Sequence, residues 1–154
     1  MPIKVLLVED NPGDVRLTRE TLCGCNNSIH LLLVSDGEEA MTFLRNEGVH
    51  KHAPRPDLIL LDLNLPKMDG RETLAVIKAD ENFRTIPIVV LTTSAAEADV
   101  AKSYSLKANC YLVKPVKLEE FETMVKSINK FWLSEVTLPK DGQAQGRSMV
   151  AGKE

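Results

Sequence analysis

The amino-acid sequence predicts an α/β fold, a doubly wound parallel sheet of five strands with five helices. Short runs rich in Val, Ile and Leu recur between residues 3 and 113, and segments with apolar residues at helical spacing separate them. Runs that are apolar at nearly every position are typical of parallel sheets, because helices cover both faces of such sheets. The length of 154 residues is enough for one domain with a hydrophobic core.

The first predicted strand is residues 3–8, with the sequence IKVLLV. Residues 12–21 have helical character, and Pro12 is expected in the first turn, where its missing N–H costs nothing. The second predicted strand is residues 29–34, with the sequence IHLLLV. These segments form the first strand–helix–strand unit of the predicted sheet.

A second helix is expected after Asp36, a residue type that favours the position just before a helix. One face of this helix carries Ala40, Phe43 and Leu44. Residues 45–56 are polar and rich in His and Pro, so we expect a loop there. Residues 58–61, with the sequence LILL, are the third predicted strand.

The second half of the chain continues the alternation. Residues 73–78 are expected in a third helix, residues 86–91 in the fourth strand, residues 95–106 in a fourth helix and residues 110–113 in a short fifth strand. The fifth helix is predicted by a stripe of apolar residues at helical spacing, namely Leu118, Phe121, Val125, Ile128 and Trp132.

Polar residues follow four of the predicted strands, at the point where each strand ends. They are Glu9-Asp10-Asn11, Asp62-Leu63-Asn64, Thr92-Thr93-Ser94 and Lys114-Pro115. In a doubly wound sheet, ligands bind beyond the carboxyl ends of the strands. We therefore expect carboxylates, a hydroxyl and an ammonium group to gather at one edge of the sheet.

Three carboxylates at this edge would repel one another and would need a cation. Oxygen ligands favour Mg²⁺, which prefers octahedral geometry and keeps several waters. Asp10 and Asp62 are each expected to supply a side-chain oxygen. Asn64 is expected to offer its backbone carbonyl. Glu9 is expected to bind the ion through a water molecule or to contact the residues that bind it directly.

A carboxylate beside Mg²⁺ is a suitable nucleophile for phosphoryl transfer, because the metal neutralises and orients the incoming group. Asp62 follows the apolar run 58–61 directly and lies centrally in the predicted sheet. We therefore expect Asp62 to be phosphorylated. Lys114 could pair with one phosphoryl oxygen, and Thr92 could donate a hydrogen bond to another.

Each of these residues also has a simpler interpretation. An Asp at a strand end often caps a turn, as Asp62 could, and Glu9 and Asp10 could cap the first helix. Thr92 could be an ordinary strand-end residue, and Lys114 could be solvated. Four such residues at the same end of successive parallel strands are nevertheless hard to explain by capping.

These residues resemble the receiver domain of two-component response regulators over about residues 3–133. The segments that carry the resemblance are VLLVEDNPGD, DLILLDLNLPKMDG, IPIVVLTTSA and NCYLVKP. The resemblance implies a flavodoxin-like sheet with strand order 2-1-3-4-5. It also implies that Asp62 accepts a phosphoryl group from a phosphohistidine of a sensor kinase. The site residues implied by the resemblance are Glu9, Asp10, Asp62 and Asn64 for Mg²⁺, Thr92 and Tyr111 as a switch pair, Lys114 as the phosphoryl partner, and a cis peptide bond before Pro115.

Two further segments resemble a smaller group within this family. The loop RNEGVHKHAPRPD and the ending FWLSEVTLP resemble the small response regulators that partner bacterial, chiefly cyanobacterial, phytochromes. One position departs from the family, since many receivers have Gly where this chain has Lys107. That position often requires a positive φ, which a lysine tolerates poorly, so either the turn differs here or it stores strain.

We expect residues 1–133 to be the receiver domain and residues 134–154 to be an extension with an apolar start and a disordered end. This extension is too short for a DNA-binding or enzymatic output domain, so the output is expected to be a partner protein or self-association. We expect a symmetric homodimer through the fourth helix, fifth strand, fifth helix and extension. Its apolar contacts would include Phe131, Trp132, Leu133 and Leu138. The apolar residues outside the main stripe of the fifth helix could instead cover the fifth strand and close the core, namely Met124, Phe131, Val136 and Leu138.

Composition excludes several classes of protein. The net charge of −3 gives no general case for nucleic-acid binding. No apolar run approaches the ~18–20 residues that cross a bilayer, and the N-terminus lacks a signal-peptide pattern. The three cysteines, an odd number, favour a reduced, cytoplasmic protein.

Two other functions stay open from the sequence. A haloacid-dehalogenase-like phosphatase also uses a strand-end aspartate, but it needs a second Asp where this chain has Asn64, and a cap domain. A pseudo-receiver would have the fold and bind proteins without being phosphorylated. A true receiver accepts the phosphoryl group once and loses it slowly, so we do not expect an enzyme.

Overall fold

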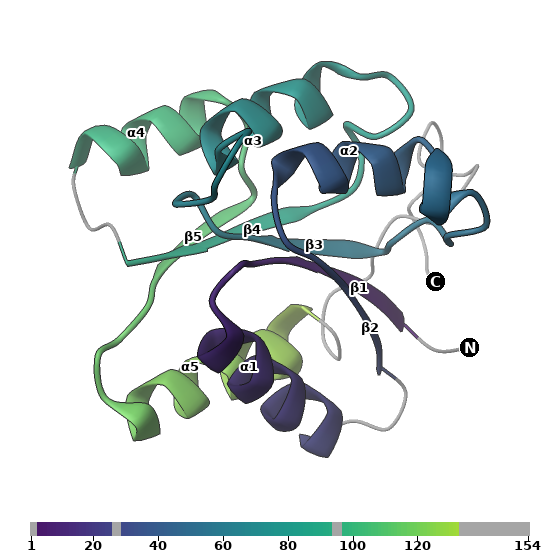
Figure 1. The fold of residues 1–154 in the computed structure, drawn as a ribbon. Coiled ribbons are helices and arrows are strands. Elements are labelled where there is room, and N and C mark those ends of the chain that lie inside the picture. The colour runs from purple at the N-terminus through teal and green to yellow at the C-terminus, as the bar shows by residue number, and fades with distance from the viewer. Residues whose placement is uncertain (1–2, 26–28, 94–96, 133–154) are drawn as a thin grey trace, which may run out of the picture.

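The computed structural model describes residues 3–25, 29–93 and 97–132, which form a parallel sheet between two layers of helices (Figure 1). The strands are β1 (Ile3–Val8), β2 (Ile29–Val34), β3 (Leu58–Leu61), β4 (Ile88–Thr92) and β5 (Cys110–Val113). Their order in the sheet is β2-β1-β3-β4-β5, and every neighbouring pair is parallel. The predicted fold class and strand order are confirmed.

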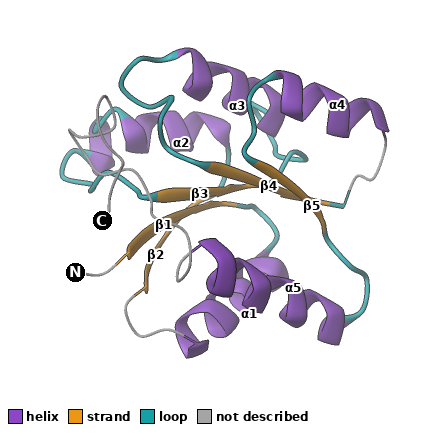
Figure 2. Cartoon of the chain, turned by 180° about the vertical axis from the view of Figure 1, so that it is seen from behind, coloured by secondary structure: helices purple, strands orange, loops and turns teal. Residues whose placement is uncertain are grey.

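Helices cover both faces of the sheet. On one face lie α1 (Pro12–Cys25) and α5 (Leu118–Lys130), and on the other lie α2 (Gly37–Leu44), α3 (Gly70–Ala79) and α4 (Glu97–Ser105) (Figures 1 and 2). This arrangement explains why the strand sequences are apolar throughout. All four residues of β3 are fully buried, with Ile59 and Leu61 in the core under α2 and α3, and Leu58 and Leu60 in the core under α1 and α5.

Most local predictions agree with the structure. Strands β1, β2, β3 and β5 occupy the residues predicted for them, and α1 and α3 extend beyond the predicted helices. Asp36 caps α2 as expected, because its Oδ1 accepts a hydrogen bond of 2.8 Å from the backbone N–H of Glu39. Within the predicted fourth helix, residues 95 and 96 lie outside the described residues.

Three predicted boundaries or faces need correction. Strand β4 begins at Ile88 rather than at residue 86, because Pro87 has no N–H to donate to a neighbouring strand. The predicted loop 45–56 contains a short 3₁₀ helix, η1 (Gly48–His50), which the side-chain amide of Asn46 braces by donating to the carbonyls of His50 and Ala53. Leu118 is 57% exposed, since it is the first residue of α5 and lies one turn before the buried part of the stripe.

The expected cis peptide bond before Pro115 is wrong. The described residues contain no cis peptide bond, so Lys114 and Pro115 are joined in trans. The trans isomer is the more stable one for X–Pro bonds by roughly 0.5–1 kcal/mol. The residue before this bond is fixed at the end of β4, since the backbone N–H of Lys114 donates a hydrogen bond of 2.7 Å to the carbonyl of Thr92.

Of the two alternatives for the turn after α4, the structure shows the strained one, since Lys107 has a φ of +75°. The chain therefore keeps the left-handed turn that many receivers form with Gly, and it does so with a side chain that disfavours this conformation.

Other predictions fall on parts of the chain that are not described. Leu133, Leu138 and the extension 134–154 lie outside the described residues, and the domain boundary at residue 133 stays a prediction. Across residues 3–25, 29–93 and 97–132, no helix has both the length and the apolar character to span a bilayer.

Candidate functional site

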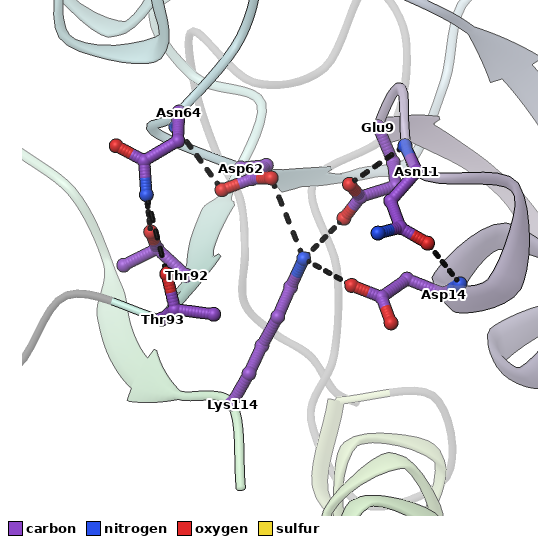
Figure 3. Close-up of polar contacts among 8 residues, drawn as sticks. All are labelled: Glu9, Asn11, Asp14, Asp62, Asn64, Thr92, Thr93 and Lys114. Carbon is purple, nitrogen blue, oxygen red and sulfur yellow. Dashed lines mark hydrogen bonds and ion pairs between the residues drawn. The ribbon is translucent and has the colours of Figure 1, made fainter. Parts of the chain in front are cut away.

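The carboxyl ends of β1, β3, β4 and β5 bring four polar residues together (Figure 3). Glu9 follows β1, Asp62 follows β3, Thr92 ends β4 and Lys114 follows β5, and all four are buried. Because buried polar groups need partners, their convergence indicates a functional arrangement at this edge. The sequence predicted all four of these positions.

Three carboxylates form the anionic part of the site. Glu9, Asp10 and Asp62 each present an oxygen atom, and these oxygens lie within 4.8 Å of one another. Glu9 and Asp62 are buried, whereas Asp10 is exposed. Opposite ligands of an octahedral Mg²⁺ ion are about 4.1 Å apart, so small shifts would let the three side chains reach one ion. The donor set is oxygen only and fits a hard divalent cation.

Lys114 is the cation that pairs with two of these carboxylates, those of Glu9 and Asp62, and with a fourth carboxylate, that of Asp14. Its Nζ lies 2.5 Å from Oε1 of Glu9, 2.8 Å from Oδ2 of Asp14 and 3.4 Å from Oδ2 of Asp62. Only 4% of its side chain is exposed, so the charge depends on these partners rather than on water.

Burial and charge shift the protonation equilibria of the site. Burial raises the pKa of Glu9 to about 7, and Asp62 adds to this rise, although Lys114 opposes it. Burial also disfavours the ammonium form of Lys114, but hydrogen bonds and charges from Asp14, Glu9 and Asp62 outweigh it, and the pKa of Lys114 is raised. The raised pKa of Lys114 keeps its ammonium form, whereas the raised pKa of Glu9 makes this carboxylate easier to protonate than an exposed one.

The sequence analysis did not identify Asp14 as a member of the site. The only local signal was its place in the first turn of α1, shortly after Glu9 and Asp10. Contact with Lys114, 100 residues away, depends on how α1 and β5 meet across the sheet. Asn11 supports this geometry, since its Oδ1 accepts a hydrogen bond of 3.0 Å from the backbone N–H of Asp14.

Asn64 bridges the loops after β3 and β4. Its backbone N–H donates to Oδ1 of Asp62 at 3.1 Å, and its side-chain amide donates to Oγ1 of Thr92 at 3.1 Å and of Thr93 at 3.4 Å (Figure 3). The contacts with Thr92 and Thr93 were not predicted. They connect Asn64 to Thr92, whose hydroxyl we expect to donate a hydrogen bond to the phosphoryl group.

The loop between β3 and α3 is fixed tightly behind Asp62. The backbone N–H of Gly70 donates to the carbonyl of Leu63 at 3.0 Å, and Asp69 caps α3 through a hydrogen bond of 3.0 Å from the N–H of Glu72. A Cβ atom at Gly70 would lie 2.5 Å from Cα of Leu63 and closer still to the carbonyl oxygen of Asp62. Glycine therefore lets α3 approach the backbone of Asp62.

The residues predicted to respond to the site lie on β5 and α5. Tyr111 is half-buried and packs against the core under α2 and α3. Phe131 is 52% exposed, whereas Trp132 packs against the core under α1 and α5, and the two rings meet edge to face with centroids 5.5 Å apart. The switch role of Tyr111 and the dimer role of Phe131 and Trp132 stay predictions.

This arrangement is suited to transfer of an anionic group to a carboxylate. A divalent cation held by the three acids and the ammonium of Lys114 would together offset the charge of an incoming phosphoryl group. Asp62 belongs to the three carboxylates and also lies 3.4 Å from Nζ of Lys114, so it is the one suited to act as the nucleophile.

Comparisons with known proteins identify a family model and several similar proteins. The family model described as the response regulator receiver domain matches residues 5–126. The chain is 51% identical over 138 residues to the response regulator Rcp1 of Synechocystis sp., covering 90% of this chain and 94% of that protein.

Two solved structures are also similar. The phosphorylated cyanobacterial phytochrome response regulator RcpA has a TM-score of 0.88 and 51% identity, covering 91% of this chain and 100% of that one. The Mn²⁺-bound form of response regulator Rcp1 has a TM-score of 0.83 and 50% identity, covering 90% of this chain and 100% of that one.

Proposed function

Since this chain belongs to the family of response regulator receiver domains, we propose that Asp62 accepts a phosphoryl group from a sensor histidine kinase, with Mg²⁺ as cofactor. The observation that carries the proposal is the position of Asp62. One oxygen of its buried carboxylate lies within 4.8 Å of a carboxylate oxygen of Glu9 and of Asp10. Its Oδ2 lies 3.4 Å from Nζ of Lys114. The Mn²⁺ and the phosphorylation named for the two similar structures support the same chemistry here.

The residues of the site divide the reaction between them. A carboxylate oxygen of Asp62 attacks the phosphorus of phosphohistidine, the P–N bond breaks, and its electron pair stays on the imidazole nitrogen, which takes up a proton. Glu9, Asp10, Asp62 and the carbonyl of Asn64 would hold Mg²⁺, which when bound supplies positive charge against the phosphoryl oxygens. Lys114 pairs with one phosphoryl oxygen, and the hydroxyl of Thr92 donates to another.

The product is expected to change the protein surface through Thr92 and Tyr111. The phosphoryl group adds roughly one negative charge and three acceptor oxygens to the site. When Thr92 moves toward it, space opens into which Tyr111 turns, and the face of α4, β5 and α5 changes shape. A preference of only a few kcal/mol for one packing is enough to shift such an equilibrium.

The partner is inferred from the relatives. Because a similar structure is that of a phytochrome response regulator, we infer that the kinase is of the phytochrome type and that the protein acts in the cytoplasm. The signal would pass on through a homodimer formed by α4, β5, α5 and the extension, with Phe131, Trp132, Leu133 and Leu138 in the contact. Exposed apolar side chains at Val113 and Phe131 support a contact on this side of the molecule.

Acetyl phosphate tests the phosphorylation directly. Wild-type protein with Mg²⁺ is expected to gain one phosphoryl group that peptide mapping by mass spectrometry assigns to Asp62. Asp62→Asn should gain none while keeping the circular dichroism of the wild type. A pseudo-receiver would gain nothing, and a phosphatase would turn acetyl phosphate over continuously. Full acyl phosphate formation on Asp62→Asn would refute the assignment.

The partner and the dimer need separate measurements. Phosphotransfer from purified histidine kinases is expected to be fastest with a phytochrome, and equal rates with unrelated kinases would contradict that inference. Sedimentation with and without beryllofluoride tests the homodimer. Only monomer at high micromolar concentration in both conditions would count against it.

A further inference from the structure

Asp14 is the feature of the site that the proposed function leaves without a role. Its carboxylate comes from α1 rather than from a strand end, and it lies 2.8 Å from Nζ of Lys114. We propose that Asp14 is a positioning residue that holds Lys114 back from Asp62, and so limits how strongly the protein binds a phosphoryl group. This inference rests on the proposed function of Asp62 and concerns the regulation of that site.

The start of α1 positions the side chain of Asp14. Pro12 opens the helix, and the side chain of Asn11 accepts a hydrogen bond of 3.0 Å from the backbone N–H of Asp14. Asp14 therefore lies in the first turn, where the partial positive charge of the helix end favours a carboxylate. Its side chain is 29% exposed, whereas that of Lys114 is 4% exposed, so Asp14 can reach Lys114 without being fully desolvated itself.

Asp14 contacts Lys114 and does not belong to the candidate metal site. The carboxylate oxygens that gather within 4.8 Å of one another belong to Glu9, Asp10 and Asp62, and Asp14 is not in this group. An ammonium group has three hydrogens to donate. Three carboxylates already surround Nζ of Lys114, and the oxygen of Asp62 is the farthest, at 3.4 Å against 2.8 Å for Asp14.

Phosphorylation makes these partners compete. A phosphoryl oxygen can take the place of the Asp62 carboxylate oxygen, which is the farthest partner of Lys114 at 3.4 Å. To reach it, Nζ must leave the position that Glu9 and Asp14 fix at 2.5 and 2.8 Å, and Asp14 is the more exposed of these two partners. The pair with Asp14 therefore favours the unphosphorylated state. Partly exposed ion pairs contribute modestly, so its removal is expected to change an equilibrium constant by about fivefold.

The test uses beryllofluoride with Mg²⁺ as the phosphoryl analogue, and isothermal titration calorimetry as the readout. Asp14→Asn keeps the shape of the side chain and removes its charge, so it is expected to bind beryllofluoride about fivefold more tightly than the wild type. Asp14→Glu keeps the charge and is expected to bind less tightly than Asp14→Asn. The affinity for Mg²⁺ alone is measured for each variant, so that a change in metal binding can be separated.

Glu20→Gln is the matched control. Glu20 lies on the same helix, pairs with Arg16 at 3.1 Å on the surface, and loses the same charge. Its beryllofluoride affinity is expected to stay within about twofold of the wild type, since an exposed charge of this kind is screened. An equal gain in Glu20→Gln would mean that net charge alone is responsible, and would overturn the proposal.

The two levels of inference fail in different ways. If acetyl phosphate phosphorylates Asp62 of the wild type and Asp14→Asn binds beryllofluoride no more tightly than the wild type, the role of Asp14 is wrong and the proposed function stands. If wild-type Asp62 is not phosphorylated at all, both are wrong. A weaker affinity in Asp14→Asn with a lower melting temperature would show that Asp14 only supports the fold, and this too would overturn the proposal.

Discussion

Gly70→Ala tests whether the fold positions the nucleophile. The added Cβ would lie 2.5 Å from Cα of Leu63, and closer still to the carbonyl oxygen of Asp62. Carbon atoms in contact prefer about 3.5 Å or more, so α3 or the backbone of Asp62 must move by about 1 Å. Both atoms belong to backbone, and rotation of a side chain cannot relieve the overlap.

The expected cost has two parts. Overpacking of this kind destabilises a protein by about 1–3 kcal/mol. For a chain of this size, that corresponds to a melting temperature lower by roughly 3–10 °C. A displacement of about 1 Å at a reacting group can lower a rate by about 100-fold. We therefore expect Mg²⁺-dependent phosphorylation of Gly70→Ala by acetyl phosphate to be about 100-fold slower than that of the wild type.

Gly24→Ala is the matched control for this change. Gly24 lies on α1, and among the described residues an added Cβ there would meet no atom within 4 Å apart from its chain neighbours and the backbone of its own helix. Alanine in a helix is more stable than glycine by about 0.5–1 kcal/mol, so this variant should melt slightly higher and be phosphorylated at the wild-type rate. A Gly70→Ala protein that is as stable and as reactive as Gly24→Ala would refute the reasoning.

Three further predictions concern the turn after α4, the core and pH. Lys107→Gly should raise the free energy of unfolding in urea by about 0.5–1 kcal/mol, because Lys107 has a φ of +75°, and an unchanged or lower value would contradict this. Ser103→Ala should also stabilise, by about 1 kcal/mol, since the buried Ser103 hydroxyl has no hydrogen-bond partner among the described residues; a loss of stability in the same urea assay would show that it has one. Burial raises the pKa of Glu9 from 4.5 to about 7, so between these pH values the metal-free folded protein holds a proton that the unfolded chain releases. The melting temperature of the metal-free protein should therefore fall as pH rises from 4.5 to about 7, whereas the affinity for Mg²⁺ should increase. Calorimetry over this pH range with and without Mg²⁺ measures both, and a Mg²⁺ affinity that does not depend on pH would contradict the prediction.

The strands could be predicted because their signal is local. Each run of Val, Ile and Leu is long enough to form a strand, and the alternation with helical segments indicates that the strands pair in parallel. The polar residues at the strand ends then followed from the rule that such ends share one edge. Glu9, Asp62, Thr92 and Lys114 were found in this way.

The contacts that could not be predicted depend on packing between distant elements. Asp14 reaches Lys114 only because α1 and the end of β5 meet at one edge, and no local pattern reports that distance. The hydrogen bonds of Asn64 to Thr92 and Thr93 likewise depend on the relative position of two loops. The exposure of Leu118 was missed because helical spacing gives the face of a residue but does not show where along α5 the core ends.

The central claim is that folding brings Glu9, Asp10 and Asp62 around one divalent ion beside the phosphoacceptor. A crystal of the protein soaked in Mn²⁺ and measured for anomalous scattering tests it most directly. We expect one strong peak in direct contact with carboxylate oxygens of Asp10 and Asp62, with Glu9 and Lys114 beside it. A Mn²⁺ peak elsewhere on the molecule, with none between Asp10 and Asp62, would contradict the account.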